Sequence, residues 1–171
     1  MLNKKVVVLD TSAILSGRPL PMGEARLVTS EGVDSEFSPG GRNFRRFELL
    51  KEAGLEVCAA EETIIEQVRS AAKKSGDDAR LSDVDVGLIA VALSFVGQGC
   101  DVSLWSDDFS IQNVCSTLNI KCEGISISTI QKRFKWRGRC RGCGRYFSKP
   151  TKECPVCGSE VRPVVVGKKD L

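Results

Sequence analysis

The sequence predicts an α/β fold, a parallel sheet flanked by helices, followed by a small all-β module that binds zinc. Short apolar segments alternate with helix-length segments through the first 123 residues, which is typical of a parallel sheet. Two Cys-x-x-Cys pairs lie near the C-terminus. The charge is divided as well: residues 1–131 hold 13 Lys/Arg against 19 Asp/Glu, a net −6, and residues 132–171 hold 12 against 3, a net +9.

Five segments are predicted strands because each is short, apolar and rich in β-branched residues. The clearest is Lys-Val-Val-Val-Leu-Asp at the N-terminus. The predicted strands are residues 5–10, 26–29, 55–58, 101–105 and 120–122.

Helices are predicted between these strands. Residues 61–74 begin with acids and end with two lysines, the order of charges that stabilises a helix. Gly76 follows and is a typical helix end. Ser82 and Asp85 have the spacing of a capping box, and the helix they open is apolar nearly all round, which predicts a central position. A short helix is predicted directly after the first strand, with Thr11 or Ser12 as its cap. The other predicted helices cover residues 30–37, 43–53 and 109–118.

The domain organisation follows from the change in composition. We expect a first domain at 1–123, a linker at 124–136, a zinc module at 137–163 and a basic tail at 164–171. Apolar residues make up 42% and charged residues 27%, which is a globular composition. No apolar run reaches the length of a membrane helix, and no signal peptide is visible, so we expect a cytoplasmic protein without a membrane partner.

The chain contains no histidine. This excludes every mechanism that needs an imidazole base, including Ser-His-Asp and Cys-His nucleophile chemistry. Any catalysis must therefore rest on carboxylates, hydroxyls, lysine or a metal ion.

Acidic residues recur where predicted strands end and helices begin. Asp10 ends the first strand, and Asp107 and Asp108 follow a later one. In a parallel sheet these ends meet at one edge. Asp83 and Asp85 open a helix that points back to that edge, and Glu36 lies in the second helical segment within reach of it.

Carboxylates gathered in one cleft repel each other unless a cation neutralises them. Hard oxygen ligands favour Mg²⁺ or Mn²⁺, which activate water and stabilise charge on a phosphate oxygen. The alternative is structural: Asp83 and Asp85 cap a helix, and Asp107-Asp108 form an ordinary turn.

These segments resemble the PIN-domain nucleases. Residues 6–13 look like the opening strand and metal-binding Asp10 of that family, and Leu-Ser-Asp-Val-Asp at 81–85 like its L-S-x-x-D segment, with Asp85 as an acid. Residues 104–109 look like its T-x-D-F segment, with Ser106 in place of Thr. Glu36 resembles the remaining acid more loosely. The resemblance implies a PIN-like sheet in which Asp10, Glu36, Asp85 and Asp108 hold the cation. Asp83 and Asp107 are expected as auxiliary acids, and Thr11 or Ser12 as the group that orients a ligand or water.

Residues 107–114 are further similar to the archaeal and eukaryotic endonucleases that mature the 3′ end of small-subunit rRNA, which also carry a C-terminal zinc ribbon. The short chain is nearer the archaeal form. The resemblance implies a Mg²⁺- or Mn²⁺-dependent endoribonuclease whose partners are single-stranded precursor rRNA and the pre-ribosomal small subunit.

Four cysteines are spaced C-x2-C-x10-C-x2-C, with a glycine after each pair. Two such turns can place four thiolates around one structural Zn²⁺, and disulfides or a redox pair are the alternatives. The module has too few core residues to fold alone, so zinc should supply its stability. The predicted zinc ligands are Cys140, Cys143, Cys154 and Cys157.

Cations and aromatic residues alternate around the first cysteine pair, which suits phosphates and bases of single-stranded RNA. The alternatives are a solvated charged tail and a ribbon core that uses Tyr146 or Phe147. The predicted RNA-binding residues are Lys135, Trp136, Arg137, Arg139, Arg141, Arg145 and Lys149.

Two other functions fit parts of the sequence. A non-catalytic RNA-binding assembly factor would use the acids only as helix caps and would bind no divalent ion besides zinc. A toxin-type PIN nuclease fits the first domain alone, and the zinc module argues against it.

Overall fold

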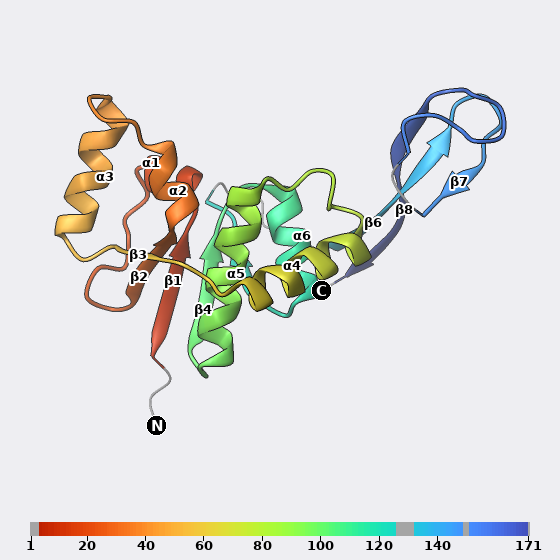
Figure 1. The fold of residues 1–171 in the computed structure, drawn as a ribbon. Coiled ribbons are helices and arrows are strands. Elements are labelled where there is room, and N and C mark those ends of the chain that lie inside the picture. The colour runs from red at the N-terminus through yellow and green to blue at the C-terminus, as the bar shows by residue number, and fades with distance from the viewer. Residues whose placement is uncertain (1–3, 126–131, 149–150, 171) are drawn as a thin grey trace.

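The computed structural model describes residues 4–125, 132–148 and 151–170, without the side chains of Arg42, 132–136 and 166–170. Five parallel strands form one sheet and three antiparallel strands a second (Figure 1). The predicted α/β fold with a small all-β module is confirmed. The strands of the large sheet are β1 Lys5–Leu9, β2 Arg26–Ser30, β3 Glu56–Cys58, β4 Asp101–Trp105 and β5 Lys121–Glu123.

The order β3-β2-β1-β4-β5 places β1 and β4 side by side at the centre of the sheet. In their register Leu9 lies opposite Trp105. The next residues, Asp10 and Ser106, are therefore neighbours at the edge where all five strands end. This edge positions the candidate site.

The helices agree with the predicted segments to within one or two residues. Helix α4 ends at Gly76 in the left-handed conformation, with φ 83°, which glycine adopts without strain. Helix α5 opens with the expected capping box of Ser82 and Asp85. The helices are α1 Thr11–Leu15, α2 Glu31–Glu36, α3 Arg42–Glu52, α4 Glu62–Ser75, α5 Asp83–Gly97 and α6 Phe109–Thr117.

The predicted cap of α1 is wrong. The cap is Asp10, whose carboxylate accepts a hydrogen bond from the Thr11 amide, and not Thr11 or Ser12. Asp10 is the single residue between β1 and α1, so the residue that follows the strand caps the helix.

Helix α5 is the centre of the core, as its apolar sequence predicted. It packs against α4, α2 and β4, and Leu88, Ile89 and Ala90 are fully buried. Because β4 starts shortly after α5 ends, α5 runs opposite to the strands, and its first turn lies at the edge where they end (Figure 1).

We expect Leu88→Ala to lower the free energy of unfolding by about 2–5 kcal/mol, because a fully buried leucine leaves a cavity that its neighbours fill only in part. Leu49→Ala is the matched control: Leu49 is 64% exposed on α3, and its loss should cost less than about 0.5 kcal/mol. Urea unfolding followed by far-ultraviolet circular dichroism measures both. Equal costs would contradict the central position of α5.

The small sheet has the order β7-β6-β8, with β6 at Lys132–Cys140, β7 at Tyr146–Phe147 and β8 at Val161–Asp170. Residues 132–136, interpreted from the sequence as linker, are part of β6, and residues 164–170, interpreted as a tail, are part of β8. These segments pair with each other over most of their length, for example Lys132 with Asp170. None of the described helices has the length and apolar character that crossing a membrane requires.

Candidate active site and metal-binding ribbon

Asp10 is held by three hydrogen bonds at the end of β1. Its Oδ1 accepts from the Thr11 amide at 2.7 Å, and its Oδ2 accepts from the hydroxyls of Ser12 at 2.9 Å and Ser106 at 2.7 Å. The side chain is half-buried. Its orientation is thus fixed before any ligand arrives, and part of the carboxylate still faces solvent.

Ser106 connects Asp10 to Asp108. Its buried hydroxyl donates to Asp10 and accepts from the Asp108 amide at 3.1 Å. The Gln112 side chain donates to the Ser106 carbonyl at 2.7 Å, which fixes the backbone of this turn. The carboxylate of Asp10 and the backbone of Asp108 are therefore only two hydrogen bonds apart. The sequence did not predict these roles for Ser106 and Gln112, and its only signal was the likeness of Ser106 to the Thr of the T-x-D-F segment.

Asp108 is the N-cap of α6. Its Oδ1 accepts from the amides of Ser110 at 2.6 Å and Ile111 at 3.2 Å, and the side chain is exposed. Capping uses one carboxylate oxygen, and no hydrogen bond to Oδ2 is among those described. The structural role and a ligand role are thus compatible for this residue.

Glu36 lies beside the same edge. The hydroxyl of Thr11 donates to its carboxylate, so Glu36 approaches the start of α1. Helix α2 also packs closely against α5: a Cβ added at Gly32 would lie 3.2 Å from the Cα of Val84. Glycine at this position lets the helix that carries Glu36 approach the helix whose first turn carries Asp85.

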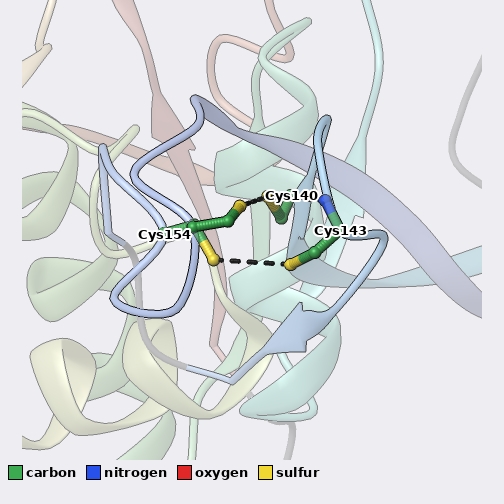
Figure 2. A group of neighbouring side chains, drawn as sticks. Cys140, Cys143 and Cys154 are labelled. Atoms are coloured by element: carbon green, nitrogen blue, oxygen red, sulfur yellow. Dashed lines mark hydrogen bonds between the residues drawn. The ribbon is translucent and has the colours of Figure 1, made fainter.

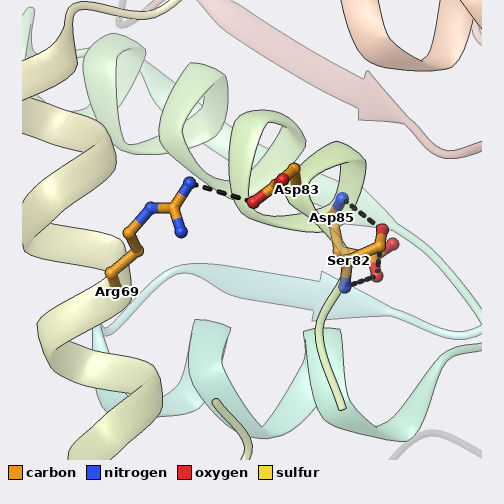
Figure 3. A network of polar contacts seen from close by, with 4 residues as sticks. All are labelled: Arg69, Ser82, Asp83 and Asp85. Atoms are coloured by element: carbon orange, nitrogen blue, oxygen red, sulfur yellow. Dashed lines mark hydrogen bonds and ion pairs between the residues drawn. The ribbon is translucent and has the colours of Figure 1, made fainter. Parts of the chain in front are cut away.

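The two acids of the first turn of α5 point in different directions, as Figure 3 shows. Asp85 turns back to Ser82 and accepts from its amide and its hydroxyl, both at 2.8 Å. Asp83 pairs with Arg69 of α4 at 2.9 Å and is 87% exposed. Capping, the structural alternative, thus holds for Asp85.

The carboxylate of Asp107 binds a backbone amide of the same chain. Its Oδ1 accepts from the amide of Ile125 at 2.7 Å and so holds the segment that follows β5. Arg18 holds the same segment through the Gly124 carbonyl at 3.3 Å and lies 4.0 Å over the ring of Trp105. Arg18 belongs to the stretch between α1 and β2 for which the sequence suggested no role.

A buried polar pair fastens the loop before α5 to α6. The amide side chain of Asn113 donates to Asp77, and both residues are about 1% exposed. Burial raises the pKa of Asp77, against the lowering effect of hydrogen bonds from Ser75 and Asn113. The loop that leads to Asp85 is thereby tied to the helix that begins after Asp108. The two residues are far apart in the sequence, which gave no signal of the pairing.

The four cysteines of the ribbon converge, as Figure 2 shows for three of them. The sulfurs of Cys140 and Cys157 lie 3.4 Å apart and those of Cys143 and Cys154 3.6 Å apart. All four sulfurs lie within 4.8 Å of one another. Sulfurs bonded at about 2.3 Å to one tetrahedral ion lie about 3.8 Å apart, so the geometry fits a four-cysteine metal site.

The pKa shifts within this cluster differ from one thiol to the next. Despite a backbone hydrogen bond from Arg145, which lowers it, burial and hydrogen bonds with Cys140, Cys154 and Cys157 raise the pKa of the Cys143 thiol to about 11. Hydrogen bonds from the side chain and backbone of Ser159 lower the pKa of the Cys157 thiol to about 6. Only a deprotonated thiol binds a metal ion. Gly144 and Gly158 follow the two pairs with φ of 73° and 70°, the left-handed conformation that closes each turn.

The carboxylates are less tightly gathered than the thiols. In the described part of the chain, the cysteines are the one group of three or more potential ligands within 4.8 Å of one another. The acids instead line one edge through Asp10, Glu36, Asp85 and Asp108. Closer approach of these like charges without a cation would be unfavourable.

A family model described as the PIN domain of ribonuclease matches residues 7–95. The chain belongs to this family. The match includes Asp10, Glu36 and Asp85, so the resemblance that predicted a PIN domain is confirmed. The matched residues include most of β1 and all of β2 and β3, and β4 and β5 complete the same sheet beyond the match.

Relatives of this PIN-domain chain are similar over nearly its full length. Endoribonuclease Nob1 of Archaeoglobus fulgidus is 47% identical over 91% of this chain and 89% of its own. Ribonuclease VapC1 of Thermoplasma acidophilum is 35% identical over 92% of this chain and 77% of its own. Endoribonuclease Nob1 of Methanocaldococcus jannaschii is 32% identical over 95% of this chain and 79% of its own. The likeness thus covers the ribbon as well as the PIN domain.

A cleft of about 470 Å³ lies where the ribbon meets the PIN domain. Arg80, in the loop before α5, lines one side, and Arg137 and Lys152 of the ribbon line the other. Val161 and Pro163 add an apolar wall. Three cations from both parts of the chain thus line one space, together with one acid, Asp78. The sequence did not predict this role for Arg80 or Lys152.

A second hollow, of about 580 Å³, lies on the ribbon beside its cysteines. It is lined by Arg139, Arg141 and Arg162, and Arg139 lies 5.8 Å from the ring centre of Tyr146. Tyr146 is 52% exposed, whereas Phe147 packs on the small core of the ribbon. Arg145 is exposed near them. Lys149 and the side chains of Lys135 and Trp136 lie outside the described part of the chain.

Proposed function

We propose that this endoribonuclease cleaves single-stranded precursor rRNA and matures the 3′ end of small-subunit rRNA in the cytoplasm, within the pre-ribosomal small subunit. Two findings support this substrate: the resemblance of residues 107–114 to nucleases with that role, and the similarity to proteins named endoribonuclease Nob1. The proposed catalytic site rests above all on one observation: Ser106 connects Asp10 to Asp108 through two hydrogen bonds.

The donor set of the site fits a hard divalent cation. Its donors are carboxylate oxygens and the chain has no histidine, which favours Mg²⁺ or Mn²⁺ over softer ions. When bound, such a cation lowers the pKa of a water molecule and stabilises charge on a phosphate oxygen. The residues that would hold it are Asp10, Glu36, Asp85 and Asp108.

The hydroxyl groups of the site keep these carboxylates in place. Ser12 and Ser106 donate to Asp10, and Thr11 donates to Glu36. A carboxylate offers about four lone-pair positions, and three hydrogen bonds leave Asp10 one for a ligand. Thr11 and Ser12 therefore orient metal ligands and do not themselves attack the RNA.

Asp83 and Asp107, expected from the sequence as auxiliary acids, have structural roles in this proposal. Asp83 pairs with Arg69 away from Asp85, and Asp107 holds the backbone of Ile125. Their removal should affect cleavage much less than removal of Asp10.

The ribbon holds the RNA strand in this proposal, and Zn²⁺ in its four-cysteine site holds the ribbon together. We assign the catalytic site to residues 1–123 and the RNA-holding module to residues 132–170. The basic cleft between them supports this division, because a strand that occupies it contacts both parts.

We expect Arg137→Glu and Lys152→Glu each to weaken single-stranded RNA binding about 3- to 10-fold at 0.1 M salt and to reduce the salt dependence of binding by about one ion. Both residues line the cleft. Arg46→Glu, an exposed position on α3, changes net charge equally and should leave affinity within about twofold. Fluorescence anisotropy with Ca²⁺ in place of Mn²⁺ measures binding. Equal weakening by all three variants would mean that overall charge, and not the cleft, binds RNA.

The substrate is tested with a precursor small-subunit rRNA fragment that includes the mature 3′ end. The zinc-loaded chain plus Mn²⁺ should cut it once, at the mature end, as mapped by primer extension and product sequencing. Cleavage spread over all unpaired segments would support a ribonuclease but contradict the proposed substrate. No cleavage at any Mn²⁺ concentration up to about 10 mM would favour a non-catalytic assembly factor.

A further inference from the structure

Phe109 is the most exposed aromatic side chain among those described. It is 60% exposed, whereas Phe47 and Trp105 are buried. It takes no part in the hydrophobic core of the large sheet. A single exposed apolar residue is ordinary on a protein surface, so exposure alone indicates nothing. Its position is what matters.

Phe109 follows Asp108 directly and is the first residue of α6. In a helix the Cα–Cβ bonds lean toward the N-terminus. The side chain of Phe109 therefore leans toward the end of α6 that carries Asp108, at the edge where Asp10 and Ser106 also lie. An exposed ring is therefore carried by the residue next to Asp108, at the edge of the sheet that carries the candidate site.

We propose that the ring of Phe109 stacks on the base of a nucleotide adjacent to the scissile phosphate. Stacking on an aromatic side chain stabilises single-stranded binding by about 1–3 kcal/mol per base and accepts any base. A paired base inside a helix has both faces covered by its neighbours, so only an unpaired nucleotide can use this ring. Phe109 thus selects single strands at the cut and contributes little to base identity.

This inference rests on the proposed function, because it assumes that RNA reaches Asp108. The Asp108 side chain needs a neighbour that holds the strand still, and the cations described above lie on the ribbon and in the loop before α5. An aromatic ring beside Asp108 supplies contact at the catalytic edge without adding a cation that would compete for its carboxylates.

The cleavage test uses the zinc-loaded full chain with Mn²⁺ under single-turnover conditions. Phe109→Ala should raise the RNA concentration for half-maximal rate about 5- to 150-fold, the equivalent of 1–3 kcal/mol. Phe109→Trp should stay near the unmodified chain, and Phe109→Leu, apolar but not aromatic, should resemble Phe109→Ala. Leu49→Ala is the control for an exposed apolar side chain elsewhere. If Phe109→Leu matches the unmodified chain, general hydrophobicity and not stacking is at work, and the proposal fails.

A substrate that lacks bases next to the cleaved phosphate separates stacking from a structural effect. With abasic riboses on both sides of the cut, the unmodified chain and Phe109→Ala should cleave at the same half-maximal concentration. An equal deficit of Phe109→Ala on intact and abasic RNA would overturn the proposal.

A crosslinking experiment does not depend on cleavage. In the Asp10→Asn chain, an unpaired oligonucleotide carrying 5-iodouridine should crosslink on irradiation to Phe109, as identified by mass spectrometry of the peptide. The same uridine within a duplex should not. Crosslinking to Phe109 without cleavage by the unmodified chain would uphold stacking and reject the nuclease. Cleavage without crosslinking at Phe109 would reject stacking alone.

Discussion

Asp10→Asn should lower the rate of Mn²⁺-dependent RNA cleavage about a thousandfold or more and leave RNA affinity within about twofold. Asparagine keeps the shape of the side chain and can still accept hydrogen bonds from Ser12 and Ser106. It removes one negative charge and a charged oxygen ligand from the site. The effect should therefore fall on catalysis and cation binding, while the distant basic surface still holds RNA.

The matched control for this variant is Asp83→Asn. It makes the same chemical change on the first turn of α5, where Asp83 pairs with Arg69 and faces solvent. We expect its cleavage rate to stay within about threefold of the unmodified chain. Single-turnover rates and anisotropy on the same RNA measure both quantities. Full activity of Asp10→Asn would show that this carboxylate is no part of the catalytic site.

Replacement of one ribbon cysteine should have the largest effect on stability. Cys154→Ser should release the metal ion, unfold the ribbon and weaken RNA binding strongly. The buried core there is only Cys140, Cys154 and Val161, with Phe147 packed against it. Such a core cannot replace the roughly 10–16 kcal/mol that Zn²⁺ supplies to small four-ligand modules. The PIN domain should still unfold as before, because its core is separate.

Zinc content by atomic absorption, together with the loss of β-structure in the ribbon by NMR, measures this effect. The unmodified chain should hold one zinc ion and Cys154→Ser none. Cys58→Ser, at a half-buried cysteine outside the ribbon, should keep the ion. Acid should release the metal too, because protons compete with the ion for the thiolates. The Cys157 thiol has a pKa of about 6 without metal, and bound Zn²⁺ keeps it deprotonated to a lower pH. A ribbon that keeps its fold without zinc would contradict the account.

The sequence predicted most of the elements because their signals are local. The capping box at Ser82, Gly76 after α4 and the apolar sequence of α5 each depend on residues within one helix. The cap of α1 was mistaken because Asp10 serves the strand and the helix at once. Residues 132–136 were interpreted as linker from the change in composition, and it is their pairing with the distant β8 that makes them a strand.

The sequence predicted which acids form the candidate site, but it did not predict how they are connected to one another. That Ser106 joins Asp10 to Asp108 follows from the register of β1 against β4, which no local pattern encodes. The pairing of Asp77 with Asn113 and the contribution of Arg80 to the cleft depend likewise on distant segments. The same packing turns Asp83 toward Arg69 and Asp85 toward Ser82.

The central claim is that Asp10, Glu36, Asp85 and Asp108 together hold a divalent cation. Crystals of the zinc-loaded chain soaked in Mn²⁺, with diffraction data at the manganese absorption edge, test it most directly. The account predicts an anomalous peak within about 2.3 Å of carboxylate oxygens of Asp10 and at least one of Glu36, Asp85 and Asp108. Crystals soaked in Mn²⁺ that show no anomalous peak at this edge of the sheet would contradict the account.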